Sequence, residues 1–582
     1  MEKIGNLWFL KGDMHIHSHY SDGERLEKNI ARVVNCGFDF CAVTDHDSFS
    51  GSRAALDLSE RIGSGFPIII RGQESTCSGC HILSYGTLND YVKSSPLEEV
   101  CRNIRAAGGY SVAAHPDWEF TRSYFRESGL FARLVENGLL DGVELMNFPA
   151  GENIRKEWTN SYYFERSAAG LPFAVTCGSD AHRANEITPE RYLAVFAETP
   201  DEKGILEAIF LHRRSVAVWR DCVIGTPEAC KLFSAVSKKR RIEAPSITRS
   251  ETQDGIIFNI ENADRSFVSG DLKKISENSF FKSGFDHGVA LLMSTRDGEK
   301  FAEYIEIPDR VDVRCIPEDD GNQAAAHFAL NSEEELSVTC EVNGVCRKFD
   351  CIPGEAGLTS GVLQEKDNSI SVEVTNKSGV VMCRKSWDFP ISCLDTWYQL
   401  ERYTVDSPSP DGVEPSAKFR FSRSGENVIL DMEVTDRLFC QPCRGIGMYM
   451  GDSVQFGLDF ACAASENDLV ERKIWEFGIS VTDTLECDFV VYNFPADADK
   501  SSADKIKRSA VRRGDKSIFQ AVIPVEFFNE DMICGFNMIY NINDGSGRRG
   551  YLAWRNGIGD RKKSADWGFI LLKQPKRFEK DA

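Results

Sequence analysis

The first third of the chain alternates short apolar runs with segments whose apolar residues recur at helical spacing. Residues 38–44, 110–114 and 173–176 are examples of the apolar runs. Between residues 26 and 34 the apolar positions recur every three or four residues, and Gly37 follows as a stop signal. Strands that alternate with helices predict a parallel sheet or a barrel in this part of the chain.

Polar and ionisable side chains follow the apolar runs, at the points where the predicted strands end. They lie in segments 13–17, 45–47, 73–74, 115–116, 144–147 and 178–182. In parallel α/β folds, active-site groups gather at the C-terminal ends of the strands. A barrel brings such groups to one mouth more closely than an open sheet does. The pattern therefore favours a (β/α) barrel, for which seven strands is one solution.

Histidine is concentrated in the same region of the chain. The ten histidines are His15, His17, His19, His46, His81, His115, His182, His212, His287 and His327. Seven of these ten fall within the first 182 residues. Chemistry that needs imidazole is therefore expected in the N-terminal third.

Two short motifs place metal-binding side chains on one face. His15 and His17 are two residues apart on a predicted strand, so both rings point the same way. Asp180 and His182 repeat this spacing at another strand end, and Asp22 adds a carboxylate in a loop. A His-x-His pair alone is explained equally well by exposed or hydrogen-bonded histidines. The neighbouring carboxylates favour the metal interpretation.

A second pair is expected across a hairpin. Residues 68–74 and 81–85 have the pattern of two strands around a tight turn, with Glu74 and His81 symmetric about residues 77–78. If these two residues pair directly, their Cβ atoms lie about 5 Å apart, close enough to share a metal ion. The alternative for His81 is a strand histidine that bonds to the backbone.

Together these motifs predict nine metal-binding side chains. The candidates are His15, His17, Asp22, His46, Glu74, His81, His115, Asp180 and His182. Imidazole and carboxylate without thiolate suit Zn, Mn or Fe better than a structural thiolate zinc site. Nine ligands are too many for one ion, so two or three divalent ions are expected.

Composition and charge narrow the class of protein. The chain has 582 residues, of which 42 % are hydrophobic and 27 % charged, and its formal net charge is −21. This length predicts three or four domains. The acidic balance argues against a general nucleic-acid or acidic-membrane binder. No apolar run approaches the ~20 residues of a spanning helix, and the N-terminus lacks a signal-peptide pattern. The 19 cysteines are scattered, so reduced thiols and a cytoplasmic location are expected.

Five motifs, in this order, resemble the PHP (polymerase and histidinol phosphatase) domain over residues 1 to about 220. They are Asp13-x-His15-x-His17 with Ser21-Asp22-Gly23, Thr44-Asp45-His46-Asp47, Gly72-x-Glu74, His115-Pro116 and Gly178-Ser179-Asp180-x-His182. Lys11-Gly12-Asp13 and Cys80-His81 look most like the CehA/McbA-type metallohydrolases. Gln73 departs from the small or aliphatic residue usual before the glutamate.

The resemblance implies a distorted (β/α)7 barrel with a trinuclear metal cluster at its mouth. One ion would be held by His15, His17, Glu74 and Asp180. Glu74 would bridge to a second ion held by His115 and His81. The third would be held by Asp22, His46 and His182. Asp13, Asp45 and Asp47 would lie behind these ligands and orient the imidazoles by accepting their free N–H groups.

The resemblance also implies a reaction. A water held between two divalent ions at Glu74 would be the nucleophile, and phosphomonoester hydrolysis fits best. A catalytic side chain is not identified. The expected substrate is a small phosphorylated molecule such as a nucleotide or a sugar phosphate. His19 and Arg183 are candidates to bind its phosphate. Two alternatives stay open: hydrolysis of a carbamate, amide or ester, and a carbohydrate-binding protein with an inactive barrel.

The rest of the chain predicts accessory domains. After a barrel at 1–222 we expect a linker helix at 223–242, a β-sandwich region of one or two small domains at 243–393, and a last β-sandwich at 394–577. The last span resembles the family 9 carbohydrate-binding module. That resemblance implies possible carbohydrate binding and allows a bound calcium ion. No polymerase-like segment follows the barrel.

Three aromatic residues of this last span are candidate platforms for a sugar ring. They are Trp397, Trp475 and Tyr492. For each of them a place in the buried core is the stronger expectation.

Overall fold

The computed structural model describes most of the chain. The described residues are 2–63, 65–77, 80–88, 97–118, 125, 129–147, 158–170, 173–220, 222–236, 244–319, 324–331, 335–351, 358–363, 367–405, 409–462, 468–528, 532–545, 548–559 and 562–572. The chain divides into two compact units, and the N-terminal one contains Met1–Arg249, Phe258–Phe281 and Val289–Ile305. The protein is therefore multidomain, as predicted. The domain boundaries given above stay predictions.

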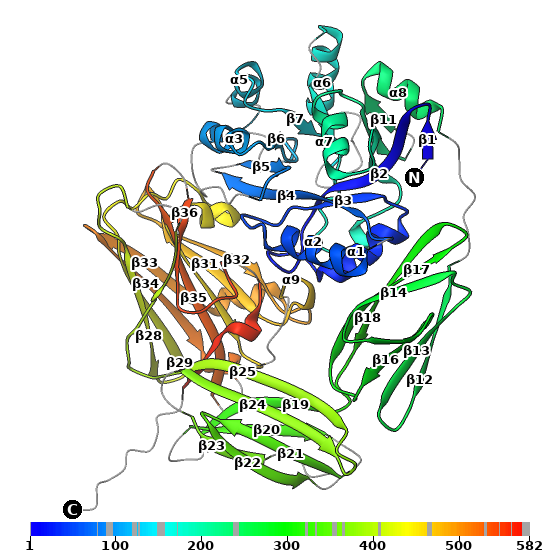
Figure 1. The fold of residues 1–582 in the computed structure, drawn as a ribbon. Helices are drawn as coiled ribbons and strands as arrows, with labels where there is room; N and C mark the ends of the chain where they lie inside the picture. Colours follow the sequence, from blue (N-terminus) through cyan, green and yellow to red (C-terminus); the bar gives the residue numbers. More distant parts are fainter. Residues whose placement is uncertain are drawn as a thin grey trace, which may run out of the picture. The chain divides into compact units, whose positions relative to one another are not determined.

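The N-terminal unit is built on a barrel-like sheet (Figure 1). Its strands are β1 (Glu2–Ile4), β2 (Leu7–Ile16), β3 (Phe40–Val43), β4 (Ile68–Cys77), β5 (Cys80–Tyr85), β6 (Tyr110–Ala113), β7 (Gly142–Glu144), β8 (Ala174–Thr176), β9 (Arg191–Ala197), β10 (Ser215–Trp219) and β11 (Cys222–Gly225). The strand order is β11-β10-β9-β2-β3-β4-β5-β6-β7-β8, with β1 paired to β2. Strands β2, β3 and β4 run parallel, and so do β6, β7 and β8.

Backbone hydrogen bonds nearly close this sheet into a ring. The amide of Met14 on β2 donates to the carbonyl of Cys177, just after β8, over 3.2 Å. The amide of Asp180 donates to the carbonyl of His15, and that of His17 to the carbonyl of Ala181, both over 2.9 Å. Strand β2 and the segment after β8 therefore meet close to four predicted metal ligands, which are His15, His17, Asp180 and His182.

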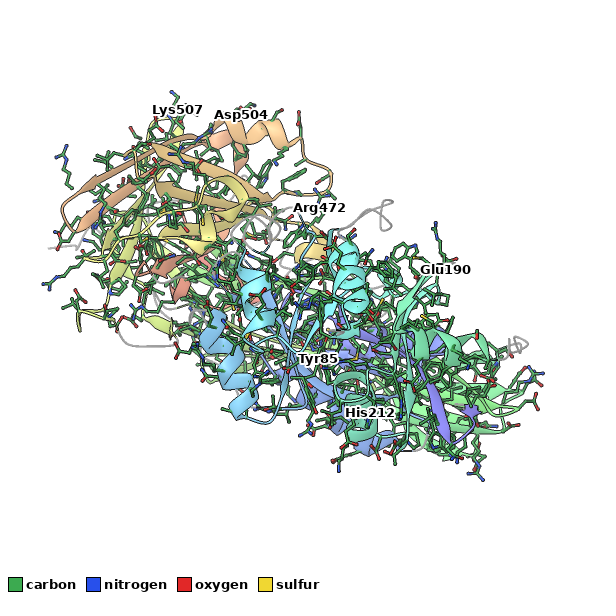
Figure 2. The ribbon with its side chains drawn as sticks, turned by 90° about the horizontal axis from the view of Figure 1, so that it is seen from above. Tyr85, Glu190, His212, Arg472, Asp504 and Lys507 are labelled. Atoms are coloured by element: carbon green, nitrogen blue, oxygen red, sulfur yellow. The ribbon has the colours of Figure 1, made fainter. Side chains whose placement is uncertain are left out.

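The ring is not a regular repeat of strand and helix. Strand β5 pairs antiparallel with both β4 and β6, so two successive strands of the ring are joined directly as a hairpin. The barrel-like sheet agrees with the expected fold class, whereas seven β/α units stay a prediction. Tyr85, which is labelled in Figure 2, fills part of the interior of this region. It is fully buried, and its hydroxyl donates to the carbonyl of Met14 over 2.7 Å.

The register of the β4–β5 hairpin differs from the expected one. Glu74 pairs with Leu83 and His81 pairs with Thr76, because the strands pair as far as Cys77 and Cys80. The expected direct pair of Glu74 and His81 was therefore wrong, because the partner of Glu74 lies two residues further along β5. The two side chains are diagonal neighbours on one face, and such neighbours remain within reach of long side chains.

The helices agree with the sequence periods where these were assigned. They are α1 (Leu26–Asn35), α2 (Ser50–Ile62), α3 (Leu97–Ala106), α5 (Leu130–Glu136), α6 (Trp158–Ala168), α7 (Glu202–Phe210), α8 (Pro227–Ser234) and, in the other unit, α9 (Asp468–Glu471). Gly37 follows α1 with a φ of 72°, a conformation that glycine adopts at no steric cost. The end of the predicted linker helix, with the basic run 238–241, lies outside the described residues.

A small β-sandwich follows the barrel. It contains a four-stranded sheet, β12-β13-β16-β15, and a three-stranded sheet, β14-β17-β18. The strands are β12 (Ser246–Glu251), β13 (Gly255–Glu261), β14 (Arg265–Gly270), β15 (Lys273–Ser276), β16 (Ser279–Ser283), β17 (Gly288–Arg296) and β18 (Glu299–Ile307). Within the N-terminal unit, the side-chain amide of Asn35 on α1 donates to the carbonyl of Ala302 over 2.6 Å and accepts from its amide over 3.0 Å. Helix α1 is thus tied to strand β18 by a two-point contact.

The C-terminal unit is all-β apart from short helical turns. Its first strands are β19 (Asp312–Asp319), β20 (Ala324–Asn331), β21 (Leu336–Val342), β22 (Val345–Cys351), β23 (Leu358–Val362), β24 (Asp367–Asn376) and β25 (Val381–Cys393). The later ones are β26 (Tyr398–Gln399), β27 (Arg402–Val405), β28 (Ser416–Ser424), β29 (Asn427–Thr435), β30 (Ser453–Asp459), β31 (Trp475–Val481), β32 (Cys487–Asn493), β33 (Lys507–Arg513), β34 (Lys516–Pro524), β35 (Ile533–Asn543), β36 (Arg548–Ala553) and β37 (Gly568–Leu571).

Strand β25 links two parts of this unit. Its first residues pair with β24, and Ile391 to Cys393 pair with β37 in parallel. The core of the last sandwich lies between the sheet containing β30, β31 and β35 and the five-stranded sheet β26-β28-β29-β34-β33. Trp475 is buried in this core, as the alternative interpretation expected. Trp397 lies under Lys418, whose ammonium is 4.2 Å from the ring centroid, and Tyr492 is partly buried.

Two further sequence expectations concern the whole chain. In the structure, none of the nineteen cysteines is in a disulfide bond. Among the residues that the structure describes, no helix has the length and apolar character needed to cross a membrane.

We predict that Gly178→Ala destabilises the barrel at its closure. A Cβ at this position would lie 2.3 Å from the Cβ of His15, 2.7 Å from the backbone nitrogen of His15 and 2.8 Å from Oε1 of Glu144, so the backbone of β2 must shift, at a cost of about 1–3 kcal/mol. Denaturant unfolding measures this loss. Gly170→Ala is the control, since its added Cβ meets open space and only the φ of 74° adds strain. Equal effects of the two substitutions would contradict the prediction.

Candidate metal centre

The structure brings all nine predicted ligands together at one end of the barrel-like sheet. They lie on or just after strands β2, β3, β4, β5, β6 and β8, with Asp22 in the loop that follows β2. Their donor atoms form three groups, each with all atoms within 4.8 Å of one another. The groups are His15, Glu74, His115 and Asp180; His46, Glu74 and His81; and His17, Asp22, His46 and His182.

The most compact arrangement surrounds Oε2 of Glu74. Nε2 of His15 lies 3.1 Å from Nε2 of His17, 3.2 Å from Oε2 of Glu74 and 3.3 Å from Oδ1 of Asp180. Nε2 of His17 lies 3.1 Å from each of these two oxygens. Four ligands placed tetrahedrally at ~2.0–2.1 Å from a zinc ion are about 3.3 Å apart. These four donors therefore fit a divalent ion.

The other oxygen of Glu74 faces a different pair of rings. Oε1 lies 2.9 Å from Nδ1 of His81 and 2.9 Å from Nε2 of His115. The two ring nitrogens are 3.3 Å apart, a spacing that again fits donors to one ion. Glu74 is fully buried, so its two oxygens are positioned to bridge two neighbouring ions.

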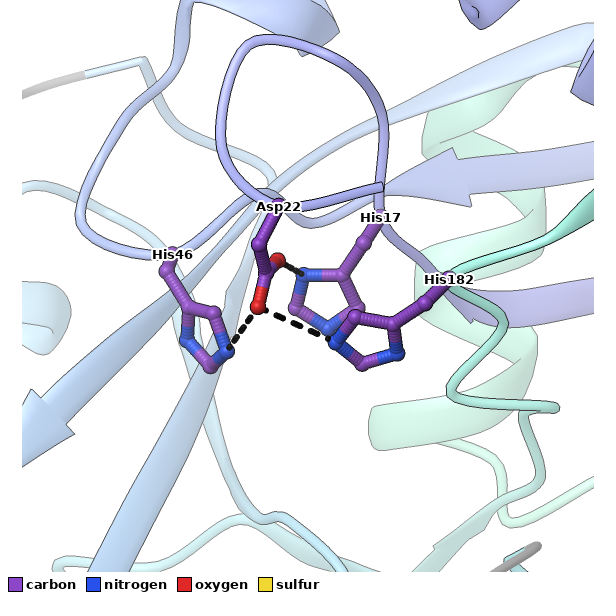
Figure 3. Close-up of side chains that lie close together, drawn as sticks. All are labelled: His17, Asp22, His46 and His182. Atoms are coloured by element: carbon purple, nitrogen blue, oxygen red, sulfur yellow. Dashed lines mark ion pairs between the residues drawn. The ribbon is translucent and has the colours of Figure 1, made fainter. Parts of the chain in front are cut away.

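Asp22 lies among the three rings of the remaining group (Figure 3). Its Oδ2 is 3.2 Å from Nε2 of His182 and 3.7 Å from Nε2 of His46, and its Oδ1 is 3.4 Å from Nδ1 of His17. Because Nε2 of His17 faces Glu74, this one ring joins two groups. The donor atoms allow three ions, and the assignment of each ligand to an ion stays a prediction.

Charge concentration perturbs the ionisable groups. Burial alone would lower the pKa of His17, but the carboxylates of Asp180 and Glu74 raise it to about 10. Burial lowers the pKa of His46 to about 4, despite the nearby carboxylate of Asp22. In the absence of ions, His17 is therefore protonated at neutral pH, whereas His46 is neutral. Protons and metal ions compete for the same donors.

Glu144, on β7, is a further residue of the site. Its Oε1 and Oε2 lie 3.1 and 3.2 Å from Nδ1 of His15, and Oε2 accepts the backbone amide of His115 over 2.9 Å. A carboxylate only accepts, so it fixes the proton of His15 on Nδ1 and leaves Nε2 free to bind a metal. Glu144 was not predicted to have a role, because no histidine or aspartate lies two residues away from it in the sequence. Its place at a strand end was the only signal.

The three aspartates expected behind the ligands have different partners from those implied. Asp13 accepts the amides of His15 and Ser179 over 3.1 and 3.0 Å. Asp45 accepts the amide and hydroxyl of Ser18, each over 2.7 Å. For Asp13 and Asp45 the expectation of imidazole partners was therefore wrong, because their carboxylates hold the backbone that carries the ligands. Asp47 accepts the amide of Thr76 over 2.8 Å.

The two predicted phosphate-binding residues lie beside the donor groups and belong to none of them. Nδ1 of His19 accepts the amide of Leu26 over 3.2 Å, at the start of α1. Arg183 follows His182 directly and is exposed. Contact of either residue with substrate stays a prediction.

Comparison with known proteins leaves the family open. The chain matches no family model, and no curated protein matches it. Among solved structures it is similar to a two-domain protein from Bacteroides vulgatus containing a predicted PHP-like metal-dependent phosphoesterase, with 17% identity, 52% of this chain and 97% of that chain covered, and a TM-score of 0.33.

Two further solved structures cover parts of the chain. A family 9 carbohydrate-binding module from Caldicellulosiruptor kristjanssonii in complex with cellotriose is 19% identical, over 29% of this chain and 80% of that one, with a TM-score of 0.22. An amidohydrolase from Chromobacterium violaceum with bound sulfate and no metal is 18% identical, over 31% and 89%, with a TM-score of 0.23. Because these TM-scores are below 0.5, the function of this chain is not inferred from the similarities.

We predict that Glu144→Gln weakens metal binding about 10- to 100-fold, since the amide keeps only one acceptor oxygen for the three donors of His15, His115 and Asn147. Titration with Zn²⁺ or Mn²⁺ against a competing chelator measures the affinity. Glu136→Gln, an exposed glutamate on α5, is the matched control. Unchanged affinity in Glu144→Gln would contradict the role assigned to this carboxylate.

We also predict that metal binding releases protons and tightens as the pH rises. With a pKa of about 10, His17 is protonated at pH 7, and an ion at this ring must displace that proton. The affinity should therefore increase with pH up to about 10. Calorimetry in buffers of different ionisation enthalpy counts the protons released. Binding without proton release at pH 7 would refute the prediction.

Proposed function

We propose that the N-terminal part of the chain is a metal-dependent phosphoesterase that hydrolyses a small phosphomonoester. The observation that carries the proposal is the arrangement around Glu74. One oxygen of this buried carboxylate faces His15 and His17 at 3.1–3.2 Å, and the other faces His81 and His115 at 2.9 Å. Two adjacent ions sharing one carboxylate are a recurrent arrangement for hydrolysis of phosphate esters.

The charge of the site favours an anionic substrate. The predicted ligands include three carboxylates, Asp22, Glu74 and Asp180. Glu144, which bonds to His15, adds a fourth carboxylate, so two dications leave these groups neutral overall and three leave them positive. A positive site in a buried pocket attracts a phosphate dianion more strongly than a neutral amide or carbamate. This supports phosphomonoester hydrolysis over the alternative hydrolases.

The chain's own residues prepare the site for this chemistry. When bound, the ions lower the pKa of the water between them and neutralise charge on the phosphoryl oxygens. Glu144 holds the proton of His15 on Nδ1. Glu74 presents one oxygen to His15 and His17 and the other to His81 and His115. Burial of His15 and Glu74 keeps bulk water from weakening these interactions.

The finer parts of the proposal follow the sequence. We assign the barrel to the PHP superfamily with a CehA/McbA-like ligand pattern, two or three ions of Mn, Zn or Fe, and a nucleotide or sugar phosphate as substrate. His19 and Arg183 would contact the phosphate. The proposed boundaries are 1–222 for the barrel, with the linker helix and the sandwich regions following as above, and the proposed location is cytoplasmic.

For the last sandwich, carbohydrate binding stays a sequence-based prediction. Among its described residues, no three His, Cys, Asp or Glu side chains gather as they do at the barrel mouth. Calcium is also held by backbone and amide carbonyls, so a bound calcium ion in this domain stays a sequence-based prediction.

The test is phosphate release from a panel of nucleotides, nucleoside bisphosphates and sugar phosphates with added Mn²⁺ or Zn²⁺. We expect turnover by the wild type and a loss of about 10³-fold or more in His17→Ala, which removes a donor shared by two groups. His212→Ala is the matched control, since His212 is exposed and belongs to none of the three donor groups.

Two outcomes would contradict the proposal. Turnover retained in His17→Ala would place the activity elsewhere or in a contaminant. Metal bound at two or three ions per chain without turnover of any phosphate ester would instead favour hydrolysis of a carbamate, amide or ester.

A further inference from the structure

Asp22 and His182 belong only to the third donor group, which they form with His17 and His46 and which we call the outer group (Figure 3). Oδ2 of Asp22 and Nε2 of His182 are 3.2 Å apart, although the two residues lie on different loops. Their side chains are 26% and 35% exposed, whereas His15 is fully buried. Core packing therefore fixes these two ligands less firmly than the inner ones, and contacts between the loops have to place them.

Glu24 joins the two loops at two points. Its backbone amide donates to the carbonyl of His182, and its Oε2 accepts the backbone amide of Ala184, both over 2.9 Å. Glu24 follows Asp22 by two residues, in the same loop. The distance between Asp22 and His182 therefore depends on this one residue between the loops.

The side chain of Glu24 is itself held in place. Its Oε1 accepts from Nζ of Lys28 on helix α1 over 3.0 Å, and this ammonium lies 5.3 Å from the ring centroid of Tyr304 on β18. Hydrogen bonds to an ionised group are stronger than those between neutral groups. One carboxylate oxygen is thus fixed by the helix, and the other is directed at the loop of His182.

A second carboxylate makes the loop of His182 rigid from within. Oε2 of Glu186 accepts the amides of His182 and Arg183, each over 2.9 Å. Nδ1 of His182 lies 3.0 Å from the carbonyl oxygen of Asp180. Because a carbonyl only accepts, the ring proton lies on Nδ1, and Nε2 keeps a free lone pair. The loop therefore presents a ready donor, and its contact with Glu24 sets where that donor lies.

We propose that Glu24 is a positioning residue that sets the affinity of the outer group for a metal ion without binding the ion itself. The inference rests on the proposed metal centre, since it assigns an ion of its own to the outer group. Glu24 belongs to none of the three donor groups, and its two oxygens bond to Ala184 and Lys28. Without its side chain the two loops can separate, so the outer ion is the one that is lost.

The test is titration of the full chain with Zn²⁺ against a competing chelator, which needs no substrate. The binding step that disappears in His182→Ala identifies the ion of the outer group. We expect Glu24→Ala to weaken this step about 10- to 100-fold, and to change the remaining steps no more than His182→Ala does. Glu60→Ala, which removes an exposed glutamate on α2, is the matched control and should change no step.

Glu24→Gln separates the hydrogen bond from the charge. Its amide oxygen can still accept the amide of Ala184, while Lys28, which is 33% exposed, can turn its ammonium to water. We expect this variant to bind the outer ion within about fivefold of the wild type, since exposed ion pairs contribute little. If Glu24→Gln is as weak as Glu24→Ala, the charge of Glu24 governs the ion and the inference is wrong.

Ala184→Pro removes the same hydrogen bond from the other loop. Ala184 begins a 3₁₀ turn (Ala184–Glu186), and Arg183 before it is extended, with φ −132° and ψ 142°, as a following proline requires. This variant should weaken the outer ion as Glu24→Ala does, and it replaces Glu24→Ala if that variant does not fold. The two substitutions together should weaken the ion no more than either alone.

The thermal midpoint of each variant shows whether it folds as the wild type does. Wild-type affinity of the outer ion in folded Glu24→Ala or Ala184→Pro, additive effects of the two, or no step lost in His182→Ala would overturn the inference. None of these results concerns turnover, so the phosphoesterase proposal would stand. Failure to hydrolyse any phosphate ester would contradict that proposal and leave the role of Glu24 as it is.

Discussion

The site depends on one buried carboxylate. Glu74 is fully buried at the mouth of the barrel-like sheet, and five imidazole rings approach its two oxygens. An ionised group in such a place is tolerated only if positive charge surrounds it. In this protein, the compensating charge comes from protonated rings or from metal ions. The fold of the barrel mouth and its chemistry are therefore set by the same residue.

The way the barrel closes explains how distant residues reach this carboxylate. His15 and Asp180 are far apart in sequence, yet backbone hydrogen bonds between β2 and the segment after β8 place them side by side. Asp13 strengthens this contact, because its carboxylate accepts amides from both segments. Positioning thus comes from the backbone first, and Glu144 then orients the ring of His15.

Sequence reasoning found the nine candidate ligands because residue type and spacing at strand ends are local signals. It could not find Glu144, whose partner His15 is 129 residues away. The hairpin register was missed for a different reason. The position of the turn decides whether Glu74 pairs with His81 or Leu83, because moving the centre of the turn by one residue changes the partner of every residue in the hairpin.

The ring of His17 has a further consequence. Its two nitrogens face two different donor groups, Nε2 toward Glu74 and Nδ1 toward Asp22. A neutral imidazole has only one nitrogen with a free lone pair, because the other carries the proton. The two groups therefore compete for one ligand unless the ring loses both protons. In the proposed metal-loaded centre, an ion bound at one nitrogen of His17 would fix the proton on the other nitrogen, so occupancy of one group would change the affinity of the other.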